Sequence, residues 1–385
     1  MWSHFGYSPV ELLRAHRQGG ELALDWPQCA GRNVILTHLS RIGIVKAFQA
    51  LKLQPGDEIL MPAYNCGSEL DPLLHCGAKL TFYRIDERTN LDLEDIQKRV
   101  TPRTRAIYVT HFFGWPQELS ELAPWCKERE LLLIEDCAHA LFSAGPQGPV
   151  GLTGDAAIHC FWKMLPMPDG GALALRKENG TSSAQMHAPP LGAALRNSIP
   201  FLRSWLRLGG RKHFCIFYQG ARNLRAAGRK RSGKRIPGGN GETPPTIPPY
   251  CFYDDKMKDW GISRVSRGLL KSVNRHEVVS RRRANYQLLL ETIQSLPLIR
   301  PLFADLPTGI CPLVLPVMVE QPSRWLSLFE ARQVYPFSWW RGHHPEFSRA
   351  DFPEAATLKN RVLAFPVDQY LGKKELEQMV TSIEA

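Results

Sequence analysis

Apolar and polar residues in the first half of the chain repeat with two spacings, one helical and one extended. Between Arg41 and Leu53, apolar residues recur at 44, 45, 48 and 51, which is the spacing of one helix face. Gly56-Asp57 ends that pattern, and the apolar run 58–61 predicts a strand. Further strands are predicted at 80–83, 106–110, 131–135, 156–161 and 172–175, and helices at 92–100, capped by Asp92, and at 118–129. Short apolar strands separated by helices predict an α/β fold whose mainly parallel sheet is covered on both faces.

The pattern changes after residue 178. Residues 228–249 are rich in Gly, Pro and basic side chains, which predicts a loop. A long helix at 276–296, a strand at 313–319 and a final helix at 373–383 predict a smaller α+β unit. We therefore expect two domains. They are a large domain over residues 1–262, with a basic, loop-rich insertion at about 178–250, and a small C-terminal domain over 263–385.

The composition is that of a globular protein. Of the 385 residues, 44% are hydrophobic and 10% aromatic, which is enough for one large core and a smaller one. No apolar run approaches the roughly 18 residues that span a bilayer, and the N-terminus lacks a basic stretch leading into an apolar one. We therefore expect a cytoplasmic protein. The nine cysteines form no C-x-x-C pair, which favours reduced thiols and no metal site.

The net charge of +11 belongs to one segment. No acidic residue occurs between Glu178 and Glu242, whereas that interval holds twelve arginines and lysines and leaves the rest of the chain near −1. We expect no specific nucleic-acid site from a charge confined in this way.

Part of this basic segment has the pattern of an amphipathic helix. Apolar residues share one helical face, basic residues share another, and Trp205 lies near the boundary. These residues are Leu195, Ile199, Leu202 and Leu206, and Arg196, Arg203 and Arg207. Pro200 predicts a helix that begins near Ser198. The pattern is typical of a surface helix packed on a core and also of a helix at a membrane surface, so contact of 196–235 with an anionic membrane or a polyanion stays open.

Two reactive side chains follow neighbouring predicted strands. Asp136 comes directly after the strand 131–135, and Lys163 follows the strand 156–161 in a bulky apolar run. An unpaired ammonium is costly to bury among bulky apolar side chains, so the lysine either reaches water or serves covalent chemistry. In open α/β sheets, ligands bind beyond the carboxyl ends of the strands. A lysine and a carboxylate there suit pyridoxal 5'-phosphate, and Thr37–Arg41, at a helix N-terminus, suits its phosphate.

Taken together, several stretches resemble the sugar aminotransferases of the DegT/DnrJ/EryC1/StrS group, within fold type I of the pyridoxal-phosphate enzymes. The matching stretches are Gly56–Tyr64, Thr101–Ile107, His111–Pro116, Ile134–Ala140, Gly154–Ala157, Lys163–Leu173 and Arg361–Val367. The likeness is close over residues 31–175 and thin over 178–255. It implies a mainly parallel sheet of seven-stranded type, a smaller C-terminal α+β domain and a homodimer.

The resemblance also implies roles for individual residues. Lys163 falls on the Schiff-base lysine, Asp136 on the partner of the pyridine nitrogen, and His139 on the contact to the phenolic oxygen. Ser40 and Arg41 fall on the phosphate-binding turn. Read from the residues alone, Asp136 or the Ser40-Arg41 pair could instead cap helices, and His139 could be a core histidine.

Four positions depart from the family pattern. Ser40 stands in place of a glycine, and Cys160 in place of a serine that contacts the phosphate. Cys66 stands in place of an aromatic ring that stacks on the cofactor, which leaves Tyr64 as the substitute, although packing would explain both residues. The asparagine that a partner subunit lends is not evident around 260–264. Farther along the chain, His111, His343 and His344 with the Trp339–Arg341 run could line a substrate pocket.

The function that the resemblance implies is amino transfer from a donor such as glutamate to a keto group, in this family usually on a nucleotide-linked sugar. Lys163 would form the Schiff base and act as the base. Related dehydratases have histidine in place of the lysine, which argues against them. Two alternatives stay open, namely a pyridoxal-phosphate enzyme acting on a non-sugar substrate and a degenerate fold type I protein with a binding role.

Overall fold

The computed structural model describes residues 7–179, 186–207 and 252–384, apart from positions 21, 23, 333 and 335. The loop predicted at 228–249 lies outside the described residues. The helices are α1 (Pro9–Gln18), α2 (Ser40–Ala50), α3 (Leu70–His75), α4 (Leu93–Arg99), α5 (Leu122–Glu128), α6 (Leu191–Arg207), α8 (Arg264–Lys271), α9 (Arg275–Gln294), α10 (Pro322–Ala331), α11 (Pro353–Arg361) and α12 (Lys373–Glu384). The strands are β1 (Asn33–Thr37), β2 (Glu58–Pro62), β3 (Lys79–Tyr83), β4 (Thr104–Thr110), β5 (Leu132–Asp136), β6 (Ala144–Gly145), β7 (Gly148–Pro149), β8 (Ala156–Cys160), β9 (Gly171–Leu175), β10 (Ile299–Pro301), β11 (Val314–Val319), β12 (Phe337–Ser338) and β13 (Val362–Pro366).

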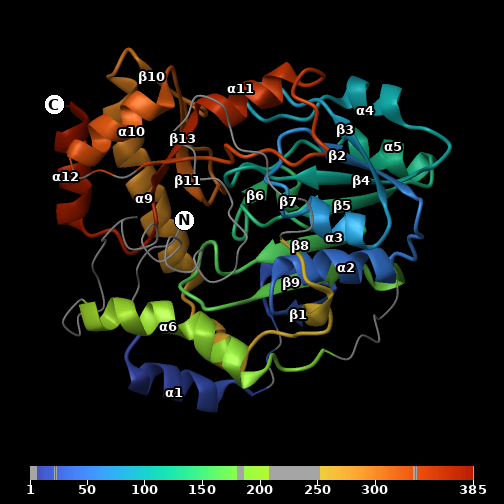
Figure 1. Cartoon of the computed structure of the whole chain (residues 1–385), viewed down its shortest axis with the longest axis horizontal. Helices are drawn as coiled ribbons and strands as arrows, with labels where there is room; N and C mark the ends of the chain where they lie inside the picture. The colour runs from blue at the N-terminus through green and yellow to red at the C-terminus, as the bar shows by residue number, and fades with distance from the viewer. Residues whose placement is uncertain are drawn as a thin grey trace.

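The main sheet has seven strands in the order β1-β9-β8-β5-β4-β2-β3. Neighbours from β8 to β3 pair in parallel, whereas β9 runs antiparallel to both β8 and β1. The predicted mainly parallel sheet is therefore confirmed. In Figure 1 the carboxyl ends of the parallel strands point toward a second, smaller sheet, so side chains that follow these strands come together in the middle of the molecule.

Local sequence explains most element boundaries. Every residue of β2, β8 and β9 is buried, as expected for central strands with near-continuous apolar character. The Asp92 side chain accepts a hydrogen bond from the Asp95 amide and so caps α4, as predicted. The helix predicted at 118–129 begins only at Leu122, because the Glu118 side chain accepts the Ser120 amide and favours a turn there.

The smaller sheet is antiparallel, in the order β10-β11-β13-β12, and has its own apolar cluster. The cluster joins α9 and α12 to the sheet through side chains such as Tyr286, Val317, Phe365 and Met379. Figure 1 shows α9, α10 and α12 gathered around this sheet. The α+β character predicted for the C-terminal part is confirmed.

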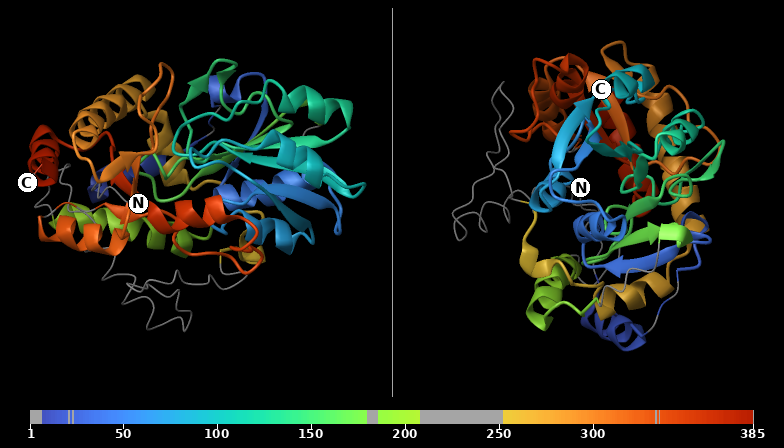
Figure 2. Two further views of the ribbon diagram at one scale, coloured as in Figure 1. Left: turned by 90° about the horizontal axis from the view of Figure 1, so that it is seen from above. Right: turned by 90° about the vertical axis from the view of Figure 1, so that its right-hand side faces the viewer.

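Helix α6 corrects one prediction. It runs without interruption from Leu191 to Arg207, although Pro200 was expected to delay its start to Ser198. Proline removes one backbone N–H, and the carbonyl that loses its partner belongs to Arg196. Because Arg196 and Pro200 are both exposed, water can satisfy that carbonyl. Both views in Figure 2 show α6 at the edge of the molecule. No helix among the described residues is both long and apolar enough to cross a bilayer.

Candidate active site

A cavity lies beyond the carboxyl ends of β4, β5 and β8. The empty space there is ≈ 350 Å³, which includes open solvent at its mouth. Six of the residues expected at the site line it, namely Ser40, Arg41, Cys66, Asp136, His139 and Lys163. Side chains separated by more than 120 positions in the sequence thus meet in one place.

Lys163 lies in the turn that follows β8 and is half-buried. The neighbouring Met164 carbonyl accepts hydrogen bonds from Arg282 Nη2 (3.3 Å) and Gln369 Nε2 (2.9 Å). The turn is therefore held from the side of the smaller sheet. Among the described residues, none forms a hydrogen bond or an ion pair with the Lys163 ammonium, which lines the cavity and is available to a ligand there.

Asp136 ends β5 and has both carboxylate oxygens oriented. Tyr108 Oη donates to Oδ2 at 2.8 Å, and the Ala138 amide donates to Oδ1 at 2.9 Å. Burial raises the pKa of Asp136, nearby Lys163 lowers it, and the Glu69 carboxylate raises it, with a net rise. A cation bound beside Asp136 would compensate for the cost of burying its charge.

His139 is a neutral imidazole. Burial and the nearby Lys163 charge hold its pKa well below the ordinary value. Its Nδ1 is buried and has no hydrogen-bond partner among the described residues. The ring lies 4.9 Å from the ring of Trp340, which also lines the cavity and has φ 51°, a left-handed conformation rare for bulky residues. An unpaired polar atom beside a strained aromatic residue is typical of a ligand site.

The N-terminus of α2 forms one wall of the cavity through Ser40 and Arg41. The first amides of a helix have no intrahelical acceptor, so they suit an anion. Close packing against β9 holds the first amides of α2 at the cavity wall, since a Cβ on Gly171 would lie only 2.8 Å from Ser40 N. Cys160 is fully buried behind Ser40, whose side chain hydrogen-bonds to its thiol, and does not line the cavity.

Arg41 makes a contact that the sequence did not indicate. Its guanidinium donates to the Phe252 carbonyl and lies 5.9 Å from the Phe252 ring centroid. The Phe252 amide in turn donates to Asp71, whose other oxygen lies 3.1 Å from His344 Nε2. The cation at the anion-binding end of the cavity is therefore positioned by the chain beyond residue 251. His344 has a structural partner in Asp71 and does not line the cavity.

Glu69 is a site residue that sequence reasoning missed. It lines the cavity and is only 4% exposed. Its carboxylate accepts hydrogen bonds from the Cys66 amide (3.0 Å) and the Cys66 thiol (2.9 Å). Burial, together with the Glu69 charge, raises the pKa of Cys66 to about 12, so this cysteine is a thiol at neutral pH. The only sequence signal for Glu69 was its position soon after β2, in a polar turn.

Tyr64 does not line the cavity. It is fully buried and packs on Phe112 and Trp340, with ring centroids 5.4 and 5.0 Å away. Behind the cavity wall, the buried ammonium of Lys359 donates to the carbonyls of Asn65 and Gly342. Tyr64 is thus placed as a packing residue, and Trp340 is the aromatic ring that reaches the cavity.

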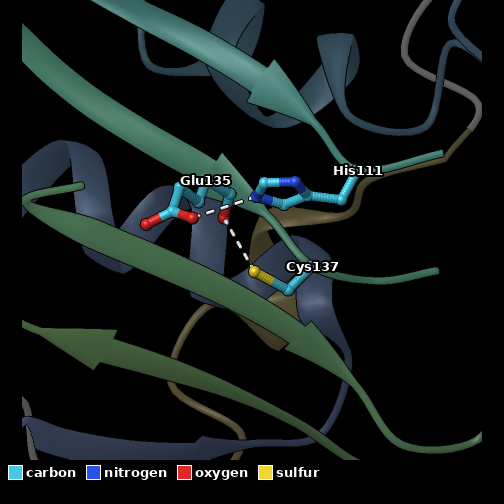
Figure 3. A group of neighbouring side chains, drawn as sticks. All are labelled: His111, Glu135 and Cys137. Carbon is cyan, nitrogen blue, oxygen red and sulfur yellow. Dashed lines mark hydrogen bonds and ion pairs between the residues drawn. The ribbon is translucent and has the colours of Figure 1, made fainter. Parts of the chain in front are cut away.

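His111 belongs to a separate buried group with Glu135 and Cys137, shown in Figure 3. Their potential ligand atoms lie within 4.8 Å of one another, but hydrogen bonds already use them. His111 Nδ1 accepts the Gln117 amide, so Nε2 carries the proton and donates to Glu135 at 3.0 Å. Burial opposes ionisation of Glu135, but hydrogen bonds from His111 and from backbone amides give a net lowering of its pKa. We therefore assign this group a structural role in joining β4 and β5, and no metal.

The donor set around the cavity fits pyridoxal 5'-phosphate. This group needs an amine for its aldehyde, a carboxylate for its pyridinium, a donor for its phenolic oxygen and a cradle for its phosphate. Lys163, Asp136, His139 and the N-terminus of α2 meet these needs around one cavity, and His139 retains an unpaired buried nitrogen. The substitution of Ser40 for glycine leaves the backbone amides of α2 in place.

Comparisons with known proteins agree with this arrangement. Residues 36–188 match the model of the DegT/DnrJ/EryC1/StrS aminotransferase family. The chain is similar to a dTDP-4-dehydro-2,3,6-trideoxy-D-glucose 4-aminotransferase of Saccharopolyspora spinosa, with 33% identity over 141 residues, 36% of this chain and 37% of that protein. It is also similar to a GDP-perosamine synthase of Vibrio cholerae, with 30% identity over 128 residues, 32% of this chain and 35% of that protein. The match thus spans little more than a third of each relative.

A solved structure extends the likeness to the whole fold. The sugar aminotransferase CalS13 from Micromonospora echinospora aligns with 100% of this chain and 99% of its own at a TM-score of 0.63 and 19% identity. Sheet order and this alignment define an α/β fold with a mainly parallel central sheet, shared with CalS13. Over residues 36–188, the chain is similar to the DegT/DnrJ/EryC1/StrS aminotransferase family.

Proposed function

We propose that this protein is a pyridoxal-phosphate-dependent aminotransferase that moves an amino group from a donor such as glutamate to a keto group on a nucleotide-linked sugar. The observation that carries the proposal is the convergence of Lys163, Asp136, His139 and the α2 N-terminus on one cavity. The two curated relatives, whose names concern dTDP- and GDP-linked sugars, support the substrate class.

The cofactor would supply an aldehyde for covalent attachment to Lys163 and a ring that accepts electrons from the substrate. The residues of the chain bind and orient the cofactor and move the protons. Asp136 holds a proton on the pyridine nitrogen through a charge-assisted hydrogen bond. Lys163 Nζ would be the base that removes the α-proton of the donor. Ser40, Arg41 and the first amides of α2 bind the phosphate.

The wider assignments stay proposals. We propose a homodimer in the cytoplasm, with a large domain over residues 1–262 and a small one over 263–385. The two separate sheets support the division of the chain, while the larger apolar cluster also includes residues of the C-terminal part, such as Val314 and Phe352.

The proposal can be tested by spectroscopy of purified protein. After incubation with pyridoxal phosphate, we expect an absorbance band at about 420 nm that is lost on adding L-glutamate. A nucleotide-linked keto-sugar should restore the band and yield an amino sugar. Lys163→Ala should remove the band, whereas Lys98→Ala, at a surface lysine that is 73% exposed, should not.

The outcomes separate the alternatives. A band that responds to amino acids but to no sugar in a panel would favour a non-sugar acceptor. Failure of the wild-type protein to form the band would overturn the proposal and favour a binding role for the fold.

A further inference from the structure

Helix α6 exposes a row of large apolar side chains. Leu191, Leu195 and Ile199 are 68%, 57% and 40% exposed. Because they are four residues apart, they lie on one face of the helix and form a continuous strip. Single exposed leucines are common on protein surfaces, but a strip of this kind marks an interaction surface.

The strip is not needed to hold α6 on the protein. A different face, which carries the buried Ala193 and Phe201, makes that contact, and the Phe201 and Tyr7 rings lie 5.7 Å apart. Figure 1 shows α6 beside α1 at the edge of the molecule. The apolar strip therefore faces outward on a helix that is already anchored.

A basic row runs beside the strip. Arg196 and Arg203 are exposed and lie seven residues, or two turns, apart on the adjoining face. Outside the described residues, the sequence 208–241 contains nine arginines and lysines and no acidic residue. An apolar strip bordered by arginines is the pattern of a helix that lies in the plane of a membrane surface.

We propose that α6 docks the protein on an anionic membrane. The strip of Leu191, Leu195 and Ile199 enters the boundary between headgroups and acyl chains, and the arginines bind lipid phosphates. The charge favours this occupant over a second copy of the chain, which would bring another basic row to the contact. A nucleic acid would use the arginines but leave the strip exposed. The proposal goes beyond the proposed function and does not depend on amino transfer.

The test is flotation of the full-length protein with vesicles. We expect it to float with phosphatidylcholine vesicles that contain phosphatidylglycerol, but not with phosphatidylcholine alone. Raising the salt concentration should release it, because screening shortens the reach of exposed charges. Arg196→Gln and Arg203→Gln should each weaken binding about fivefold.

The apolar strip is tested by Leu195→Gln combined with Ile199→Gln, which should abolish flotation. Leu298→Gln is the matched control, because Leu298 is 72% exposed on the C-terminal part of the chain. Circular dichroism establishes that each variant is folded. Three results would overturn the proposal: no flotation of the wild type with anionic vesicles, unchanged flotation of the double leucine-strip variant, or a fall of that variant's mass in solution to half of the wild type's, which would make the strip a contact between copies.

Discussion

At the scale of single residues, hydrogen bonds already orient the Asp136 carboxylate before any cation binds beside it. Its two oxygens are oriented by Tyr108 and the Ala138 amide, while burial gives its charge a cost. Asp136→Asn removes a charge-assisted hydrogen bond worth about 1.5–3 kcal/mol, so we expect pyridoxal phosphate to bind roughly 10- to 150-fold more weakly. Titration of the variant with cofactor, followed by absorbance, measures this change.

Tyr108→Phe refines that prediction. It removes only the hydroxyl that orients Asp136, so cofactor affinity should fall by about 1 kcal/mol, or roughly fivefold. Equal affinity of wild type and Asp136→Asn would show that this carboxylate does not hold the cofactor.

The sequence indicated Lys163 and Asp136 because each follows an apolar strand, and the topology of parallel sheets brings strand ends together. It indicated His139 through the family resemblance. It could not indicate Glu69, which lines the cavity because packing buries it beside Cys66. Nor could it show that Arg41 is held by the Phe252 carbonyl, 211 positions along the chain. Such contacts arise from packing and have no local pattern.

At the scale of elements, α1 is attached to α8 through two glycines. A Cβ at Gly268 would lie 1.9 Å from the Ala15 carbonyl oxygen, and one at Gly19 2.0 Å from that of Arg264. We expect Gly268→Ala to force α1 away from α8 and to cost about 1–3 kcal/mol of unfolding free energy. Limited proteolysis should then cleave the chain before residue 20 faster than in wild type.

The matched control is Gly192→Ala in α6. No atom lies within 4 Å of a Cβ built there, so the substitution should stabilise the helix by about 1 kcal/mol. Similar urea midpoints for the two alanine variants would contradict the close packing of α1 and α8.

Helix α6 shows the limit of local rules, because it continues through Pro200 where the sequence predicted a boundary.

At the scale of the whole molecule, a buried lysine makes stability depend on pH. Burial lowers the pKa of Lys359 from 10.5 to about 8. Below pH 8 the ammonium is charged in the folded and unfolded states, and folding carries the full cost of burying it. Between about pH 8 and 10.5 only the unfolded state holds the proton, so this cost is relieved as the pH rises.

We therefore expect the unfolding free energy of wild type, relative to Lys359→Met, to rise by on the order of 3 kcal/mol across that range. Urea unfolding at several pH values measures the difference, and parallel curves for the two proteins would contradict it.

The alternation of strands and helices predicted the sheet well, but the division at residues 262 and 263 and the homodimer stay predictions. They depend on contacts between units, which no single stretch of sequence encodes.

The proposed function depends most directly on Lys163 as the residue that binds the cofactor covalently. Borohydride reduction of the protein with pyridoxal phosphate fixes any such bond, and peptide mass spectrometry locates it. We expect a single reduced adduct on the peptide that contains Lys163, absent from Lys163→Arg. An adduct on another lysine, with Lys163 unmodified, would contradict this role.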